Sequence, residues 1–311
     1  MSQVFMSATI EPTIAPVTSA EPRYVETVIR RKTGWAGVDW QELANHRELL
    51  YFLTWRDVKV KYKQAVFGPA WAIVVPLVSA LIYYAVGMFA GFADQTYGKT
   101  PYIVWVYAGL LPWLFIQTAI NGGGLALVNN QALLSKIYMP RIFIPTSMIG
   151  SAIVDMAMSS IIFVGMILFF MIKTGGAFVP SWQSIFVLPL FVLLLIGSLG
   201  TAYLLSAVTI MFRDLRFIIP FMTQLGIWLT AVVYPQTIFV KYDAAGNVIA
   251  DYRNWLALNP FAGIVQGFRS AILGEPWQWV QLASSIVLCL ALFVFGLAYF
   301  KRVERRFADI A

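Results

Sequence analysis

The stretch SIFVLPLFVLLLIGSLGTAYLLSAVTIM, residues 184–211, carries no charged side chain. A helix needs about 20 predominantly apolar residues to cross the hydrocarbon core of a bilayer. The stretch therefore predicts a membrane-spanning helix. Five more runs of this kind on either side of it bring the predicted spans to six; these runs lie at about 69–92, 103–128, 145–172, 217–240 and 280–300.

The composition also indicates a membrane protein. Of the 311 residues, 59% are hydrophobic and 12% are charged, whereas a typical soluble domain has about 25% charged residues. The single cysteine, Cys289, excludes a disulfide framework. With one cysteine and one histidine, His46, most catalytic triads and zinc sites cannot be assembled within one subunit. We therefore assign no catalytic residue and no metal ligand.

The positive charges indicate the orientation of the chain. If the N-terminus is cytoplasmic, 17 of the 22 Lys and Arg residues fall in inside segments and five fall outside. Cytoplasmic loops of membrane proteins carry an excess of these residues. The split predicts cytoplasmic N- and C-termini, with a basic cytoplasmic tail at 301–311. It also explains the net charge of +7 by topology and by contact with anionic lipids, rather than by nucleic-acid binding.

Two segments with different properties precede the first span. Residues 1–38 are rich in Ala, Thr, Pro and Glu, and we expect a disordered cytoplasmic tail. Within 39–68, Asp39 and Glu42 have the spacing of a capping box, and apolar residues then recur near helical spacing. This pattern predicts an amphipathic helix in the membrane interface. Residues 57–63 alternate with period two, as in a strand, but their place beside a span argues against a lone strand.

The longest outside segment, 241–279, contains Asn259-Pro260 and an apolar stretch at 261–273. This stretch is too short to cross a bilayer. We expect short re-entrant or interfacial helices before the last span. The predicted fold is therefore an all-α polytopic membrane protein, with a transmembrane domain at 69–300 preceded by the interface helix.

Asp155 lies in the middle of the third predicted span. An ionised carboxylate at the centre of a span costs about 2.5–3.5 kcal/mol on insertion scales. Asp155 fits either a proton or cation site or a carboxyl group that is hydrogen-bonded to a neighbouring helix. No acid in another span accompanies it, which favours the structural role.

Aromatic residues make up 15% of the chain, and many lie near the ends of predicted spans, as in an interface belt. The alternative is a pore lining for sugar rings, whose C–H faces stack on aromatic side chains. The candidate channel aromatics are Tyr83, Tyr84, Trp228 and Tyr234. Residues 93–100 match a relaxed Walker A pattern, but a span rather than a strand precedes them. We therefore expect no nucleotide site in this chain.

Several short motifs follow one another in a fixed order between residues 40 and 300. They are Arg47-Glu48-Leu49-Leu50, Trp55 to Gln64, Gly68-Pro69-Ala70-Trp71, Asn129-Asn130, Leu133 to Arg141, Phe212-Arg213-Asp214-Leu215, Tyr234-Pro235, Leu258-Asn259-Pro260-Phe261 and Gly267-Phe268-Arg269. In this order and spacing they resemble the ABC-2 type permeases, which are the membrane subunits of ATP-driven polysaccharide exporters. The resemblance is strongest to the O-antigen exporter membrane subunit of lipopolysaccharide biosynthesis.

The resemblance implies a half-transporter that works as a homodimer in the bacterial inner membrane. Two copies of a separate cytoplasmic ATPase subunit would bind ATP and Mg, so the chain itself would be no enzyme and would hold no cofactor. An undecaprenyl-diphosphate-linked polysaccharide would be the substrate. The resemblance further implies short helices at 255–276 that cap the channel exit, and a coupling loop within 129–144. ATPase contacts in that loop would come from Asn130, Lys136, Tyr138 and Arg141.

A cluster of basic residues stands just before the first span. We hypothesise that it attracts the diphosphate head of the substrate electrostatically; its members are Arg56, Lys59, Lys61 and Lys63. Other functions stay open: export of capsule or teichoic acid, export of drugs or lipids by the same fold, and a polyprenyl-linked membrane transferase. A wide channel through the dimer would favour a long glycan over a drug. Activity without an ATPase would favour the transferase.

Overall fold

The structure is a computed structural model that describes residues 40–63, 68–92, 100–136, 139–243 and 248–304, all within the compact unit Gly37–Ala311. The predicted N-terminal tail, 1–38, lies outside the described residues. So do residues 93–99 of the Walker-like loop, and Tyr138 of the predicted coupling loop. Of the predicted basic tail, residues 301–304 are described.

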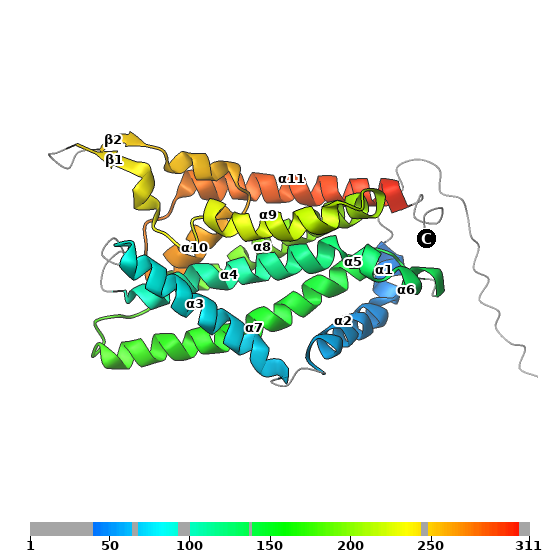
Figure 1. The fold of residues 1–311 in the computed structure, drawn as a ribbon, viewed down its shortest axis with the longest axis horizontal. Coiled ribbons are helices and arrows are strands. Elements are labelled where there is room, and N and C mark those ends of the chain that lie inside the picture. Colours follow the sequence, from blue (N-terminus) through cyan, green and yellow to red (C-terminus); the bar gives the residue numbers. More distant parts are fainter. Residues whose placement is uncertain (1–39, 64–67, 93–99, 137–138, 244–247, 305–311) are drawn as a thin grey trace, which may run out of the picture. The chain divides into compact units, whose positions relative to one another are not determined.

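Five described helices are long and apolar enough to cross a membrane (Figure 1). They are α3 (Trp71–Phe89), α4 (Tyr102–Gly124), α7 (Phe143–Lys173), α8 (Val187–Met211) and α11 (Trp279–Val303). Short 3-10 turns precede two of them, namely η1 (Gly68–Ala70) before α3 and η3 (Trp182–Phe186) before α8. These helices lie on five of the runs that hydropathy predicts, as expected for a polytopic membrane protein.

The run predicted at 217–240 is different. Its helix, α9 (Leu215–Leu229), has 15 residues and stops well before the end of the run. It ends in a Schellman motif, in which Ala231 has a left-handed φ of 54° and the N–H of Val232 donates to the carbonyl oxygen of Ile227. Glycine usually occupies this position. Because an alanine stands there, the sequence carries no signal that the helix stops.

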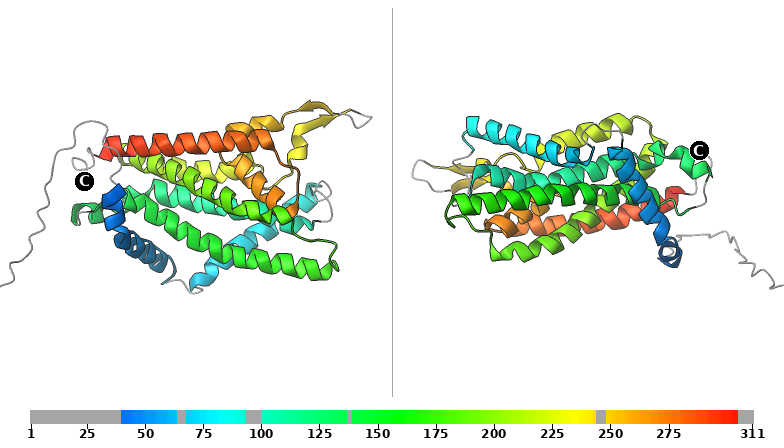
Figure 2. Two further views of the ribbon diagram at one scale, coloured as in Figure 1. Left: turned by 180° about the vertical axis from the view of Figure 1, so that it is seen from behind. Right: turned by 90° about the horizontal axis from the view of Figure 1, so that it is seen from below.

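Two helices precede the first span: α1 (Trp40–Asn45) and α2 (Arg47–Tyr62). The period-two pattern at 57–63 does not form a strand: residues 57–62 form the last turns of α2, and Lys63 is its C-cap. α2 packs against α7 (Figure 2). Leu53 is buried in an apolar cluster, whereas Trp55 on another side of α2 is exposed. This two-sided arrangement suits a helix at a membrane interface.

Short elements make up the rest of the described chain. α5 (Ala126–Asn129) and α6 (Gln131–Lys136) follow α4. Between α9 and α11 the chain forms η4 (Gln236–Phe239), β1 (Val240–Tyr242), β2 (Val248–Asp251), η5 (Arg253–Leu258) and α10 (Ala262–Leu273). The two strands pair antiparallel, with Val240 opposite Asp251. This small sheet departs from the all-α prediction, and α10 lies in the segment predicted to hold short helices.

α4 is the central helix of the described unit. Most of its side chains are buried among α3, α7, α8, α9 and α10, whereas the other four long helices leave much apolar surface exposed. α8 and α11 cross closely, because a Cβ on Gly296 would lie 2.1 Å from the carbonyl oxygen of Gly200. Small residues at helix crossings are typical of membrane proteins. The exposed apolar surface suits contact with lipid or with another subunit.

Candidate functional site

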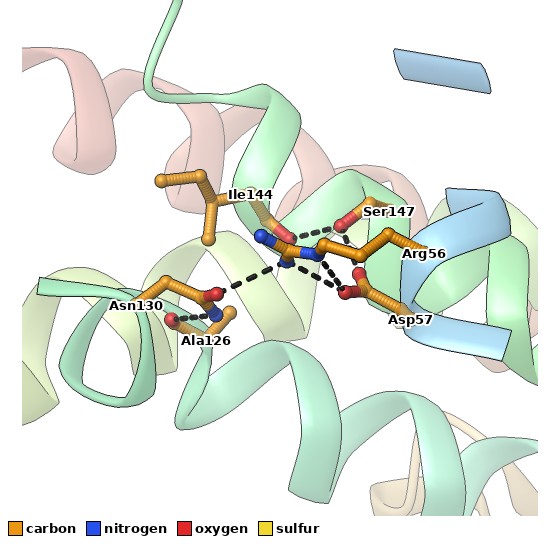
Figure 3. Close-up of polar contacts among 6 residues, drawn as sticks. All are labelled: Arg56, Asp57, Ala126, Asn130, Ile144 and Ser147. Atoms are coloured by element: carbon orange, nitrogen blue, oxygen red, sulfur yellow. Dashed lines mark hydrogen bonds and ion pairs between the residues drawn. The ribbon is translucent and has the colours of Figure 1, made fainter. Parts of the chain in front are cut away.

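A polar junction joins three segments that lie far apart in the sequence (Figure 3). Arg56 on α2 donates to the carboxylate of Asp57 from Nε at 2.9 Å and from Nη2 at 2.6 Å. Nη2 also donates to Oδ1 of Asn130 at 3.0 Å. Ser147 on α7 donates to the other carboxylate oxygen of Asp57 at 2.7 Å. These four residues, called the polar junction below, connect α2, α7 and the turn between α5 and α6.

Local structure fixes both sides of the junction. Asn130 follows the last residue of α5, and its Nδ2 donates to the carbonyl oxygen of Ala126 at 2.9 Å. The amide is thereby oriented so that Oδ1 faces Arg56. The side chain of Asp57 is only 8% exposed. A buried charge requires partners, which explains why both the guanidinium of Arg56 and the hydroxyl of Ser147 turn toward it.

α2 contacts α7 at a second place. Lys61 and Tyr62 both donate to the carboxylate of Asp155. Burial raises the pKa of Tyr62 well above its usual value, with further contributions from the hydrogen bond to Asp155 and from its negative charge. The phenol therefore stays protonated and donates. The contact with a neighbouring helix that the sequence indicated for Asp155 is present, and its partner is α2.

Removing the carboxylate of Asp155 is expected to loosen α2 from α7. Asp155→Leu takes away the shared acceptor of Lys61 and Tyr62. We expect the free energy of unfolding to fall by about 1–2 kcal/mol, because the 44% exposure of the Lys61 side chain weakens the pair. Thermal melting of the purified chain measures the change. The control is the double variant Lys61→Leu/Asp155→Leu, which leaves no unpaired charge. A double variant less stable than Asp155→Leu alone would contradict the assignment.

The structure divides the four basic residues that were hypothesised to attract a substrate head group. Arg56 and Lys61 each form an ion pair with an aspartate. Lys59 and Lys63 are exposed, and neither has an acidic partner among the described residues. The Nζ of Lys59 lies 5.3 Å from the centre of the Trp55 ring. Arg56 and Lys61 thus form ion pairs within the chain, whereas Lys59 and Lys63 stay available to a ligand.

Three of the residues predicted to contact an ATPase are described, and they belong to the turn after α5, to α6 and to the segment before α7, which lie together at one end of the helices (Figures 1 and 2). Asn130 belongs to the polar junction. Arg141 precedes α7 and donates from Nη1 to the carbonyl oxygen of Glu304 at 2.7 Å, just beyond α11. Lys136 is the last residue of α6. The structure thus connects Asn130 with α2 and Arg141 with the end of the last long helix.

The candidate channel aromatics fall into two places. Trp228 and Tyr234 stack with 6.3 Å between ring centres, and the hydroxyl of Tyr234 donates to the carbonyl oxygen of Trp228. Tyr83 and Tyr84 lie on α3, where Tyr84 is 5.9 Å from the ring of Tyr102. Tyr83 and Tyr234 pack against the main apolar core, whereas Trp228 is 45% exposed. Of the four, Trp228 is thus the most open to a ligand.

Sequence reasoning missed the most deeply buried charge of the described residues. Arg269 on α10 is fully buried, and its guanidinium carbon lies 3.5 Å from the centre of the Trp105 ring. It donates to the carbonyl oxygens of Trp105 at 3.4 Å, of Ala231 at 2.9 Å and of Val232. The available signal was a single arginine within the apolar stretch 261–273. Counting it as a loop charge concealed its structural role.

Comparison with known proteins gives long alignments with transport proteins, although no protein-family model matches the chain. The O-antigen export system permease protein RfbA of Myxococcus xanthus is 27% identical over 264 residues, which covers 82% of this chain and 94% of that protein. A protein of the same name from Klebsiella pneumoniae is 25% identical over 269 residues, covering 85% and 95%. The polysialic acid transport protein KpsM of Escherichia coli is 21% identical over 252 residues, covering 80% and 91%. The chain is therefore a distant homologue, over most of its length, of polysaccharide export permeases.

Proposed function

We propose that this chain is the membrane-spanning permease subunit of an ATP-driven exporter that moves a lipid-linked polysaccharide of O-antigen type across the bacterial inner membrane. The observation that carries the proposal is the homology to O-antigen export permeases over 82–85% of the chain. The five membrane-crossing helices support it. Because its homologues are permease proteins, the chain is a transport subunit rather than an enzyme.

The proposed topology has six passages, with both termini in the cytoplasm. The 15 residues of α9 rise about 22 Å, whereas the hydrocarbon core is about 30 Å thick. The irregular residues after Leu229 complete this passage. Their carbonyl groups are held by Arg269, and non-helical backbone is tolerated at membrane depth when it is buried in protein.

The proposed partners are a second copy of the chain and two copies of a cytoplasmic ATPase. One exposed face of α9, formed by Phe217, Phe221 and Trp228, supports pairing with a second copy. The ATPase would bind ATP and Mg²⁺, and this chain would hold no cofactor. The proposed substrate is an undecaprenyl-diphosphate-linked glycan, whose diphosphate would meet the exposed charges of Lys59 and Lys63.

In this proposal the polar junction transmits movement from the ATPase. Displacement of the turn between α5 and α6 moves Asn130, and the hydrogen bond to Arg56 carries the displacement to α2. Asp57 passes it on to Ser147 and hence to α7. Because Asp155 also ties α7 to α2, the interface helix and this span move together.

Co-purification from the native membrane tests the proposal. We expect an ATPase subunit in a one-to-one ratio with the chain, with hydrolysis that responds to substrate. Replacing the coupling-loop residues Lys136, Tyr138 and Arg141 by alanine should reduce the recovered ATPase about tenfold or more. Lys241→Ala in β1, at the opposite end of the helices, is the matched control and should leave recovery unchanged. A chain that purifies alone and still acts on a polyprenyl-linked substrate would contradict the proposal in favour of a membrane transferase.

A second candidate function is the export of a capsule-type polymer or a teichoic acid. The specific observation in its favour is the similarity to a polysialic acid transport protein. Measuring which surface polymer disappears when the chain is deleted separates these substrates. Export of a drug or small lipid by the same fold predicts no loss of any surface polymer.

A further inference from the structure

A hollow of about 520 Å³ opens between α2, α4 and α7. Its polar wall comes from Gln117, Thr118 and Asn121 on α4 and from Ser151 on α7. Asn121 follows Gln117 by four positions and Thr118 by three, so the three side chains lie on one face of α4. Lys61 and Asp57 of α2 also line the hollow, and Asp57 belongs to the polar junction. The hollow therefore adjoins the segment that the proposed function couples to the ATPase.

Three side chains of this wall have unused hydrogen-bonding groups. No described residue hydrogen-bonds the amide of Gln117, the hydroxyl of Thr118 or the hydroxyl of Ser151. Asn121 differs, since its Oδ1 accepts a hydrogen bond from Thr223 at 3.0 Å. In the membrane an unsatisfied polar group costs several kcal/mol, and polar groups within spans typically face a cavity or a transport path. The free hydrogen-bonding groups of the wall therefore indicate a polar ligand.

The charges around the hollow favour a neutral ligand over a diphosphate. Lys61 is paired with Asp155, and Asp57 is paired with Arg56, so the α2 residues that line the hollow offer no surplus positive charge. Diphosphate recognition relies on unpaired Arg or Lys. The free groups of the wall are amides and hydroxyls, which both donate and accept hydrogen bonds. The hydroxyl groups of a sugar have the same dual character.

We propose that the hollow lined by Gln117, Thr118, Asn121 and Ser151 is a carbohydrate subsite at the cytoplasmic start of the transport path. It takes sugar residues of the exported glycan, while the lipid anchor and its diphosphate stay outside near Lys59 and Lys63. The apolar remainder of the wall, which includes Val60 and Met148, packs against the C–H faces of the sugar rings. Its volume lies within the usual range of ligand pockets, about 300–1,000 Å³. This inference rests on the proposed function.

Cysteine labelling provides a direct test. The only natural cysteine, Cys289, is buried, so an introduced cysteine dominates the reaction with a maleimide. Ser151→Cys is to be labelled in inside-out vesicles from a strain that makes the glycan and from one that does not. We expect the glycan to slow labelling about threefold to tenfold. Arg213→Cys, in the exposed turn before α9, is the control and should label equally in both.

Undecaprenyl diphosphate without sugar is then added to the vesicles that lack glycan. It should leave the labelling of Ser151→Cys unchanged. Equal protection by this lipid and by the glycan would overturn the subsite in favour of a head-group site. Protection by neither would also overturn it. A separate measurement tests the proposed function: the wild-type chain is returned to cells from which it was deleted. If surface glycan reappears, the proposed function holds even when the subsite is overturned. If it does not reappear, the proposed function is contradicted.

A matched pair of threonine variants gives a second readout. Thr118→Val removes a free hydroxyl of the hollow, and we expect the glycan concentration for half-maximal stimulation of the ATPase complex to rise about threefold to tenfold. Thr209→Val removes a buried hydroxyl whose one partner among the described residues is the carbonyl oxygen of Leu205 in its own helix. This control should leave stimulation unchanged. Equal shifts in both variants would overturn the subsite, because they would report altered helices rather than lost ligand contacts.

Discussion

Arg269→Met is expected to abolish accumulation of the folded chain in the membrane. The guanidinium satisfies the carbonyl oxygens of Trp105, Ala231 and Val232, and all of these groups are buried. Breaking such a buried charged network by removing one partner costs about 3–5 kcal/mol. The margin of stability of a typical protein is only about 5–15 kcal/mol. Arg269 bonds Ala231 and Val232 in the middle of the irregular segment, whereas Asn259 and Tyr102 bond its ends at Leu229 and Val233. Loss of the guanidinium should therefore release the middle of the segment between α9 and η4.

The residues around Arg269 cannot readily compensate for its loss. Glu275 accepts hydrogen bonds from Trp105 at 2.5 Å and from Gln266 at 2.7 Å, and only 4% of the residue is exposed. Arg269 interacts electrostatically with this carboxylate, so its loss removes a favourable partner of a buried charge. Gly109 leaves the space that the guanidinium fills, since a Cβ there would lie 2.3 Å from Nη2. We therefore expect Gly109→Ala to destabilise the chain by displacing Arg269.

The measurement is the yield and melting temperature of the chain after solubilisation in detergent. Arg269→Lys keeps the charge but loses the planar fork, so it should fall between the wild type and Arg269→Met. The matched control is Arg253→Met. Arg253 pairs with Asp251 at 2.5 Å on the exposed hairpin side, and such pairs contribute about 0–1 kcal/mol. An Arg269→Met chain with the melting temperature of Arg253→Met would refute the role assigned to Arg269.

The long helices were predictable from sequence because the bilayer sets their length. A run such as 184–211 has to satisfy its backbone internally over the whole hydrocarbon core, so hydropathy alone places α8 within a few residues. Hydropathy does not predict the end of α9. Its apolar residues continue to Val240, yet the helix stops at Leu229 because Ala231 turns left-handed. That turn depends on Arg269, 38 residues away along the chain, and no local pattern reports such a partner.

From the sequence, Arg56 and Asn130 of the polar junction were predicted as site residues, but neither Asp57 nor Ser147 was, and none of the pairings was predicted. Charge clustering indicated Arg56 and Lys61, yet both were interpreted through their charge toward a ligand. The structure shows that each is held by an aspartate, one of them the neighbouring residue Asp57 and the other Asp155 on another helix. The pair between Lys61 and Asp155 is long-range and follows from the packing of α2 on α7. Composition and periodicity describe one helix at a time, so they do not reveal such pairs.

The same pairing leads to the second large expected effect, on coupling. Arg56→Met should leave ATP hydrolysis by the assembled exporter intact and lower the amount of glycan exported per ATP about tenfold or more. The hydrogen bond from Arg56 to Asn130 is the described side-chain link between α2 and the turn that follows α5, and charge-assisted hydrogen bonds contribute about 1.5–3 kcal/mol. Asn130→Ala removes the same bond from the other side, so it should have a similar effect.

A double-mutant cycle in reconstituted vesicles separates this mechanism from attraction of a substrate head group. If Arg56 and Asn130 act as one link, the variant Arg56→Met/Asn130→Ala should be no more uncoupled than either single variant. Arg47→Met is the matched control, because Arg47 carries the same charge on the same helix, is exposed and is not assigned to the substrate. Losses that simply add, or an equal loss in Arg47→Met, would mean that positive charge on α2 matters and the link does not. If Arg47→Met keeps coupling and the double variant loses no more than each single variant, movement of the turn after α5 reaches α2 through this hydrogen bond.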